Sequence, residues 1–152
     1  MQPNFERLID EALSKVDGID IYTFALYHDH ESGFFSICID TKENSDIQVA
    51  ESNKYAMKHF RGMISESDIE GAMLWQANVG RNLSLGDFHA VNIAEIELTS
   101  LEVDDSFYLA AINALQNKAE LILQRSSHGQ SLLFCCSTAN DEVGLTWVQE
   151  NA

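Results

Sequence analysis

The segment His28-Asp29-His30-Glu31 alternates imidazole and carboxylate side chains between two apolar runs. Residues two apart in an extended strand point to the same face, so the rings of His28 and His30 would lie side by side. Imidazole and carboxylate groups bind zinc and non-haem iron, which makes a metal-binding sensor or a metal-dependent enzyme one hypothesis. Such a site needs a third ligand. The remaining histidines are isolated in the sequence: His59, His89 and His128.

The same residues also fit a simple structural role. The polar segment 28–33 ends in Ser32-Gly33 and separates two hydrophobic stretches, which is typical of a hairpin turn. Gly33 can adopt the positive φ that such turns often require. The sequence therefore favours a turn over a metal site.

Motifs for other kinds of catalysis are missing from the sequence. Ser84-Leu85-Gly86 lacks the preceding glycine of a nucleophile elbow, and the loop 80–86 lacks the Gly-Lys-Ser/Thr of a phosphate-binding loop. The three cysteines are an odd number without C-x-x-C spacing, so we expect small buried hydrophobic side chains: Cys38, Cys135 and Cys136. Adjacent Cys135 and Cys136 should face opposite sides of a strand. No catalytic residue and no cofactor is predicted.

The charge balance restricts the possible partners. Nine Lys and Arg oppose twenty-four Asp and Glu, which gives a formal net charge of −15. Phosphate groups are bound by clustered cations, so nucleic acid and anionic membranes are excluded as partners, whereas a basic protein is favoured. Since there is no long apolar segment and no signal-like N-terminus, the sequence predicts a cytoplasmic protein. We expect Asp29, Glu31 and Trp75 to contribute to partner binding, because aromatic anchors with nearby charge favour protein recognition.

Hydrophobic periodicity predicts the main elements. Helices are expected over 4–16, from Ser45-Asp46 to about residue 60, and over 104–122. Strands are expected over 21–27, 34–39, 132–136 and 143–148. The region 61–101 is less regular: 72–75 reads as a short strand, and 88–98 fits either a strand or a short helix.

Together these elements predict an α+β fold, with an antiparallel sheet of four or five strands and about three packed helices. The length and the lack of a linker predict a single domain over 1–152. An exposed edge strand in such a sheet would permit a homodimer. A further hypothesis is a regulatory domain that binds a small ligand beside Trp75 or Trp147.

Three segments resemble a family of uncharacterised bacterial domains with a FALY-like strand and an acidic hairpin. They are IYTFALYHDHESGFFSICIDT, DDSFYLAAINALQNKAELI and SLLFCCSTANDE. The resemblance implies an acidic turn at 28–33 and supplies no catalytic residues. Small acidic domains of this kind are similar to immunity-type proteins, which neutralise toxins by binding them. The leading hypothesis is therefore a non-enzymatic, cytoplasmic protein-interaction module of immunity type that binds a basic partner through its acidic surface.

Overall fold

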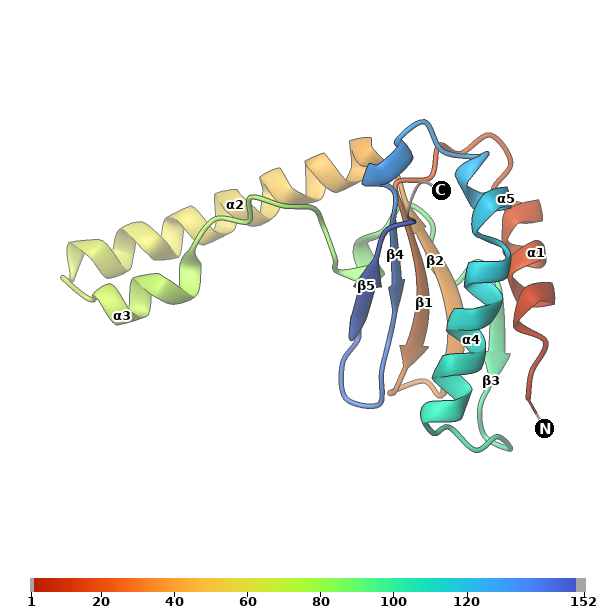
Figure 1. Ribbon diagram of the computed structural model, residues 1–152. Helices are drawn as coiled ribbons and strands as arrows, with labels where there is room; N and C mark the ends of the chain where they lie inside the picture. Colours follow the sequence, from red (N-terminus) through yellow and green to blue (C-terminus); the bar gives the residue numbers. More distant parts are fainter. Residues whose placement is uncertain (1, 150–152) are drawn as a thin grey trace.

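The computed structural model describes residues 2–149 and consists of a sheet covered by helices, the body, and a long helical arm (Figure 1). The helices are α1 (Phe5–Lys15), α2 (Lys42–Ser65), α3 (Ile69–Ala72), α4 (Asp105–Asn117) and α5 (Ala119–Leu123). The strands are β1 (Thr23–Asp29), β2 (Phe34–Asp40), β3 (Glu95–Glu97), β4 (Leu133–Cys136) and β5 (Leu145–Trp147). Among these helices, none is long and apolar enough to cross a membrane.

The five strands form one sheet in the order β3-β2-β1-β4-β5. This confirms the α+β prediction, but the sheet is mixed, so the prediction of a purely antiparallel sheet is wrong. β1 and β4 run parallel, with Thr23 opposite Leu133, whereas the other neighbouring strands are antiparallel. The reason is the connection before β4. Helices α4 and α5 return the chain across one face to the end where β1 begins, as in other parallel crossovers (Figure 1).

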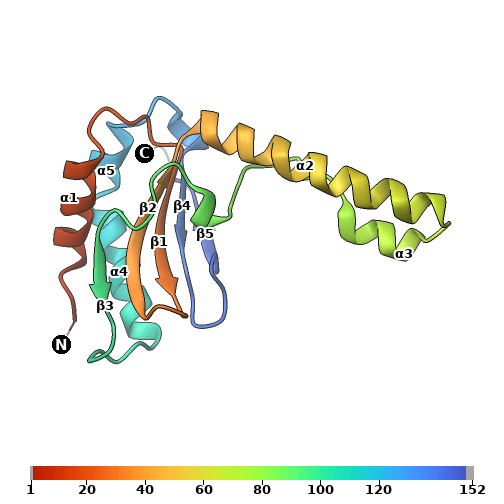
Figure 2. The same ribbon diagram turned by 180° about the vertical axis from the view of Figure 1, so that it is seen from behind.

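The main core lies between the sheet and helices α1, α4 and α5 (Figures 1 and 2). The side chain of Asn4 caps α1 by accepting a hydrogen bond from the backbone N–H of Arg7 at 3.0 Å, which satisfies a free donor of the first turn. The predicted apolar face of α1 is buried: Phe5, Leu8, Ile9, Ala12 and Leu13. The predicted hairpin of β1 and β2 is confirmed. β1 is central in the sheet, which suits a strand with apolar residues on both faces.

A smaller cluster covers part of the opposite face of the sheet. The segment 80–90, with a short 3-10 turn at Leu85–Asp87, lies over this face (Figure 2). The buried members of this smaller cluster are Ala25, Cys38, Leu85, Phe88 and Cys135. Cys136 lies in the main core instead, which confirms that Cys135 and Cys136 face opposite sides. Burial raises the pKa of Cys38 to about 11 and that of Cys135 and Cys136 to about 12, so these thiols remain protonated at neutral pH.

The arm comprises residues 42–80 and projects from the end of β2 (Figures 1 and 2). Its main helix, α2, begins earlier than predicted, because Thr41 and not Ser45-Asp46 caps it: Thr41 Oγ1 accepts from the Asn44 N–H at 3.1 Å. The helix also ends later than predicted, at Ser65 and not at about residue 60. Ser45 is the only buried residue among the 24 of α2, and its hydroxyl accepts a hydrogen bond from the backbone N–H of Asn82. Most of α2 therefore has no contact with the body.

Three further expectations for local structure need correction. The predicted strand at 72–75 is wrong, because Ala72 ends the short helix α3 and Met73–Trp75 form a 3-10 turn packed against α2. Within 88–98, only Glu95–Glu97 forms a strand, at the edge of the sheet. The helix predicted over 104–122 is interrupted at Lys118, which separates α4 from α5.

Candidate functional site

The turn between β1 and β2 is shorter than the polar segment 28–33. His28 and Asp29 end β1, and the turn itself comprises residues 30–33, with Gly33 at a φ of 76°. Asp29 Oδ1 accepts hydrogen bonds from the backbone N–H groups of Glu31 and Ser32, at 3.0 and 3.2 Å. Hydrogen bonding from Ser32 is the main reason that the pKa of Asp29 lies below its ordinary value. The turn interpretation is confirmed for residues 30–33.

The two histidines lie side by side, as their spacing predicted. Their ring centroids are 3.8 Å apart, beside a hollow of about 390 Å³ that Asp29, Glu31 and Glu142 also line. His28 Nδ1 lies 2.6 Å from the hydroxyl of Tyr108 on α4, and His30 Nε2 lies 3.2 Å from the carbonyl oxygen of Thr138. Each imidazole thus already has one ring nitrogen engaged by the protein.

Within residues 2–149, no three or more His, Cys, Asp and Glu side chains are grouped in a way that could hold a metal ion. The other histidines are not brought to His28 and His30. His59 stacks on Trp75 in the arm, at 4.1 Å between ring centroids, and His89 and His128 line a hollow at the root of α2. Metal binding by His28 and His30 stays a prediction without a third ligand from these histidines.

The stability of the protein is expected to depend on the protonation of His28. Burial, and secondarily the charge of His30, lowers its folded-state pKa below the ordinary value of 6.5. As the pH falls from 6.5 toward the folded pKa, the unfolded chain takes up more protons than the folded one. The stability that neutral His28 contributes is thus fully present above pH 6.5. It is lost as the pH falls from 6.5 through the folded pKa. The melting temperature should decrease less between about pH 8 and pH 5.5 in a His28→Gln variant; equal decreases would contradict this.

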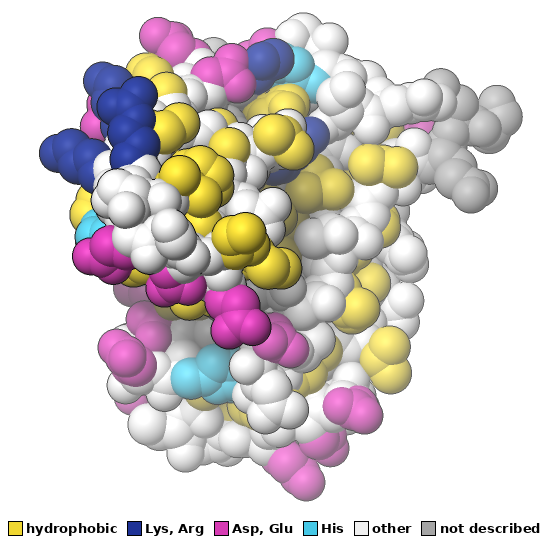
Figure 3. All heavy atoms as spheres, turned by 90° about the vertical axis from the view of Figure 1, so that its left-hand side faces the viewer, with side chains coloured by type: hydrophobic (Ala, Val, Ile, Leu, Met, Phe, Trp, Pro, Cys, Tyr) yellow, Lys and Arg dark blue, Asp and Glu magenta, His cyan; other side chains and the backbone are white. Residues whose placement is uncertain are grey.

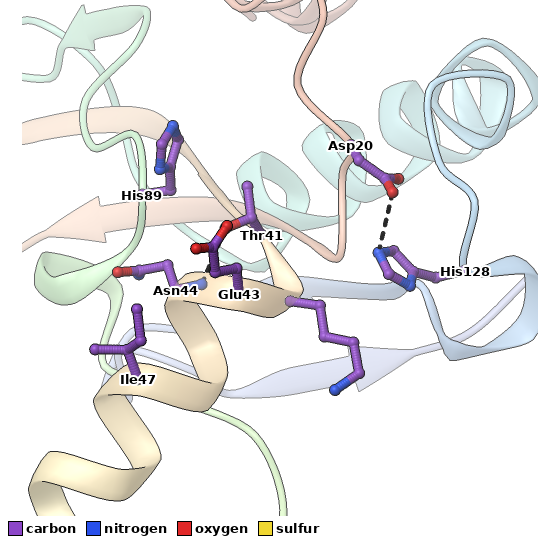
Figure 4. Close-up of a pocket in the computed structure, with 8 residues that line it drawn as sticks. Asp20, Thr41, Glu43, Asn44, Ile47, His89 and His128 are labelled. Atoms are coloured by element: carbon purple, nitrogen blue, oxygen red, sulfur yellow. Dashed lines mark hydrogen bonds and ion pairs between the residues drawn. The ribbon is translucent and has the colours of Figure 1, made fainter.

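The hollow at the root of α2 measures about 470 Å³ (Figure 4). Asp20 and His128 point toward one another across part of it, with 3.5 Å between Asp20 Oδ2 and His128 Nε2. Hydrogen bonds from Ser127 hold the pKa of Asp20 below its ordinary value. Ile47, one of the lining residues, presents an apolar side chain that is 52% exposed. The hollow therefore combines the contact between Asp20 and His128 with an exposed apolar surface.

Two residues that the sequence analysis missed fasten the arm to the body. Asp40, fully buried at the end of β2, accepts hydrogen bonds at Oδ1 from the N–H groups of Thr41 and His89 and from the side-chain amide of Asn44. Arg81, where the arm returns, donates to the carbonyl oxygen of Tyr22, and its guanidinium lies 3.8 Å from the centre of the Tyr22 ring. In the sequence, the only feature that pointed to Asp40 was a charged residue next to a helix cap. Local patterns could not reveal Arg81, because its partners come from distant segments.

The structure places the predicted partner-binding residues at two separate sites. Trp75 lies in the arm, where it packs against Tyr55 and His59 and lines a hollow of about 260 Å³. Asp29 and Glu31 lie at the end of the sheet opposite the root of the arm, where Asp29 ends β1 and Glu31 belongs to the hairpin turn (Figure 1). Trp147 stacks on Phe134 at 5.9 Å. A small ligand beside Trp75 or Trp147 stays a prediction.

Acidic side chains gather at the end of the sheet that carries the hairpin turn. Three segments meet at this end (Figure 1), namely 28–34, 97–105 and 138–144. They contain no Lys or Arg but eight carboxylates: Asp29, Glu31, Glu97, Glu102, Asp104, Asp105, Asp141 and Glu142. We call this surface the acidic end.

Comparison with protein-family models, curated proteins and solved structures gives no match to this chain.

Proposed function

We propose that this protein is a non-enzymatic interaction module whose acidic end binds a basic partner protein. The observation that carries the proposal is the separation of charge between body and arm. The arm holds four of the nine Lys and Arg residues and six of the twenty-four Asp and Glu residues, which leaves the body with five against eighteen, a formal charge of −13. A field of this strength attracts cationic proteins and accelerates their association.

Most cations of the body are already engaged by other groups of the protein. The ammonium groups of Lys15 and Lys118 lie 3.1 and 2.9 Å from carboxylate oxygens of Glu11 and Asp10. The guanidinium groups of Arg81 and Arg125 donate to backbone carbonyl oxygens of the body. Four of the five are thus engaged, and all four lie outside the three segments of the acidic end. A partner approaching this end would therefore meet carboxylates without competing Lys or Arg from those segments.

The exposure of the arm and the carboxylates of the acidic end favour a binding function over a catalytic one. His28 and Tyr108 are engaged with each other, and Asp29 is engaged by its own turn. Carboxylates on exposed side chains, such as Glu31 and Glu102, suit electrostatic recognition of Lys and Arg. An immunity-type role, implied by the resemblance alone, is the form of this function that we propose to test first.

The test is affinity capture from a lysate of the native host at low salt, followed by identification of the captured proteins. Wild type should capture a basic protein. The triple variant Glu31→Lys, Glu102→Lys, Asp141→Lys should no longer capture this protein, because its rate of association with the partner falls about tenfold or more. Capture should also weaken as salt is raised, because exposed charges are screened.

The matched control carries the same charge change away from the acidic end: Asp17→Lys, Glu120→Lys and Asp87→Lys. It should retain most of the binding. Failure of wild type to capture any basic protein, or equal losses in the two triple variants, would contradict a specific role of the acidic end.

A further inference from the structure

The outward face of α2 carries a stripe of residues with the spacing of a helix-pairing surface. Steps of four and three alternate along it, which is the heptad spacing that keeps one face turned toward a partner helix. The stripe comprises Glu43, Ile47, Ala50, Lys54, Met57, Arg61 and Ile64. All seven are exposed, and the large apolar members Ile47, Met57 and Ile64 are 52%, 45% and 49% exposed. Helix α2 also packs against α3 and the turn at Met73–Trp75. Its side chains Asn53, Ala56 and Phe60 line the hollow beside Trp75, and Met57, at the edge of the stripe, borders the same hollow.

Charge is segregated along α2. The half next to the body carries Glu43, Asp46 and Glu51 together with Lys42, which forms an ion pair with Asp46 at 2.8 Å, and the half toward the tip carries Lys54, Lys58 and Arg61. In Figure 3, Lys and Arg side chains gather at one corner of the arm, beside a group of hydrophobic side chains. Of the three tip-side cations, only Lys54 forms an ion pair in the part of the chain that the structure describes, at 3.8 Å from Glu51.

The stripe is complementary to itself when a second copy is turned end for end about Ser52. Glu43 and Arg61 are equally spaced on either side of Ser52 in the sequence, so each would face the other across an antiparallel pair. Ile47 and Met57 are related in the same way, as are Ala50 and Lys54. Such matching is what an isologous two-fold interface requires, because residue i must fit j and j must fit i.

We propose that two copies of this chain associate through antiparallel α2 helices. At 1.5 Å per residue, α2 is about 36 Å long, so the tip of each arm reaches the root of the other. Ile64 would then lie level with the hollow that Ile47 and Thr41 line in the partner copy. Association also gives the arm the packing that a solvated helix of this kind lacks, since helices in proteins are stabilised mainly by tertiary contacts.

The proposal does not depend on the acidic end, which lies at the opposite end of the sheet from the root of α2 (Figure 1). One helix pair is a small interface, so the dimer should be weak, populated at about 100 µM and sparse at about 1 µM. Salt should weaken it further, because its ion pairs are exposed.

The experiment is sedimentation velocity on the full chain, with single charge reversals and their mixture. Glu43→Lys places two cations against each other at both symmetry-related contacts, and Arg61→Glu does the same with two anions. Each single variant should dimerise about tenfold or more weakly than wild type. An equimolar mixture of the two should recover dimer, because Lys at 43 then faces Glu at 61 while the other contact is native.

Recovery in the mixture cannot come from a change within one chain, since residues 43 and 61 are about 27 Å apart along one helix. Glu70→Lys, an exposed position on α3 outside the stripe, is the matched control and should leave the wild-type equilibrium unchanged. Circular dichroism shows whether each variant is folded. A wild-type monomer at about 100 µM, or a mixture that remains monomeric while wild type dimerises, would overturn the proposal.

Discussion

Replacing Phe35 with Ala is expected to lower the free energy of unfolding by about 3–5 kcal/mol, the usual cost of removing a buried aromatic ring. Phe35 is fully buried on β2, and its ring contacts Phe5 of α1 and Phe107 of α4 edge to face, at 5.6 and 5.1 Å between centroids. Phe5 and Phe107 also contact each other at 5.1 Å. The three rings join the sheet to two helices, so a cavity at Phe35 weakens three elements at once. Urea denaturation followed by circular dichroism measures the loss.

Phe34 provides the matched control, because it is the same residue type one position earlier on β2 and points to the opposite face. It is only partly buried and lies outside the main core. Phe34→Ala should therefore cost clearly less than Phe35→Ala. Similar losses in the two variants would show that the aromatic trio does not hold the helices to the sheet.

The second large effect is expected at Asp40, the buried carboxylate at the root of α2. Asp40→Ala removes the acceptor of three hydrogen bonds, from the Thr41 N–H at 3.0 Å, the Asn44 side-chain amide at 2.7 Å and the His89 N–H at 3.0 Å. Hydrogen bonds to charged groups contribute about 1.5–3 kcal/mol each, and donors left without an acceptor in the interior are costly. We expect a loss of about 3 kcal/mol or more in the free energy of unfolding.

Asp40→Asn separates the role of the acceptor from that of the charge. All three hydrogen bonds converge on Oδ1, whereas Oδ2 is buried and has no hydrogen-bond partner among residues 2–149. An Asn side chain keeps an acceptor oxygen at the Oδ1 position. The free energy of unfolding should therefore fall less in Asp40→Asn than in Asp40→Ala. A loss in Asp40→Asn as large as in Asp40→Ala would mean that the negative charge, and not the acceptor geometry, holds the root of the arm.

Several elements could be predicted because their signals are local. The spacing of Phe5, Leu8 and Ile9 predicts a helix with one buried face, and that face is buried against the sheet. The stretch 21–27 is rich in β-branched and aromatic residues and is apolar on both faces, which predicts an inner strand, and β1 lies between β2 and β4. The alternation at Cys135 and Cys136 places one thiol on each face. In each case, the period of the backbone alone decides which side chains share a face.

The elements that were predicted wrongly depend on distant contacts. Residues 72–75 carry an apolar run that is compatible with a strand or a helix, and packing against α2 selects the helical form. The parallel pairing of β1 with β4 follows from the path of α4 and α5, which hydrophobic periodicity does not encode.

The sequence by itself determined the acidic charge, which follows from composition alone. It also determined the amphipathic helix expected over 4–16, the hairpin and the position of His28 and His30 on one face, because these follow from the local period of the backbone. Only the tertiary structure decided that Trp75 lies in a projecting arm, far from Asp29 and Glu31, and that Asp40 and Arg81 fasten that arm to the body. These contacts join segments far apart along the chain. Packing of the whole fold, which no local pattern records, brings them together.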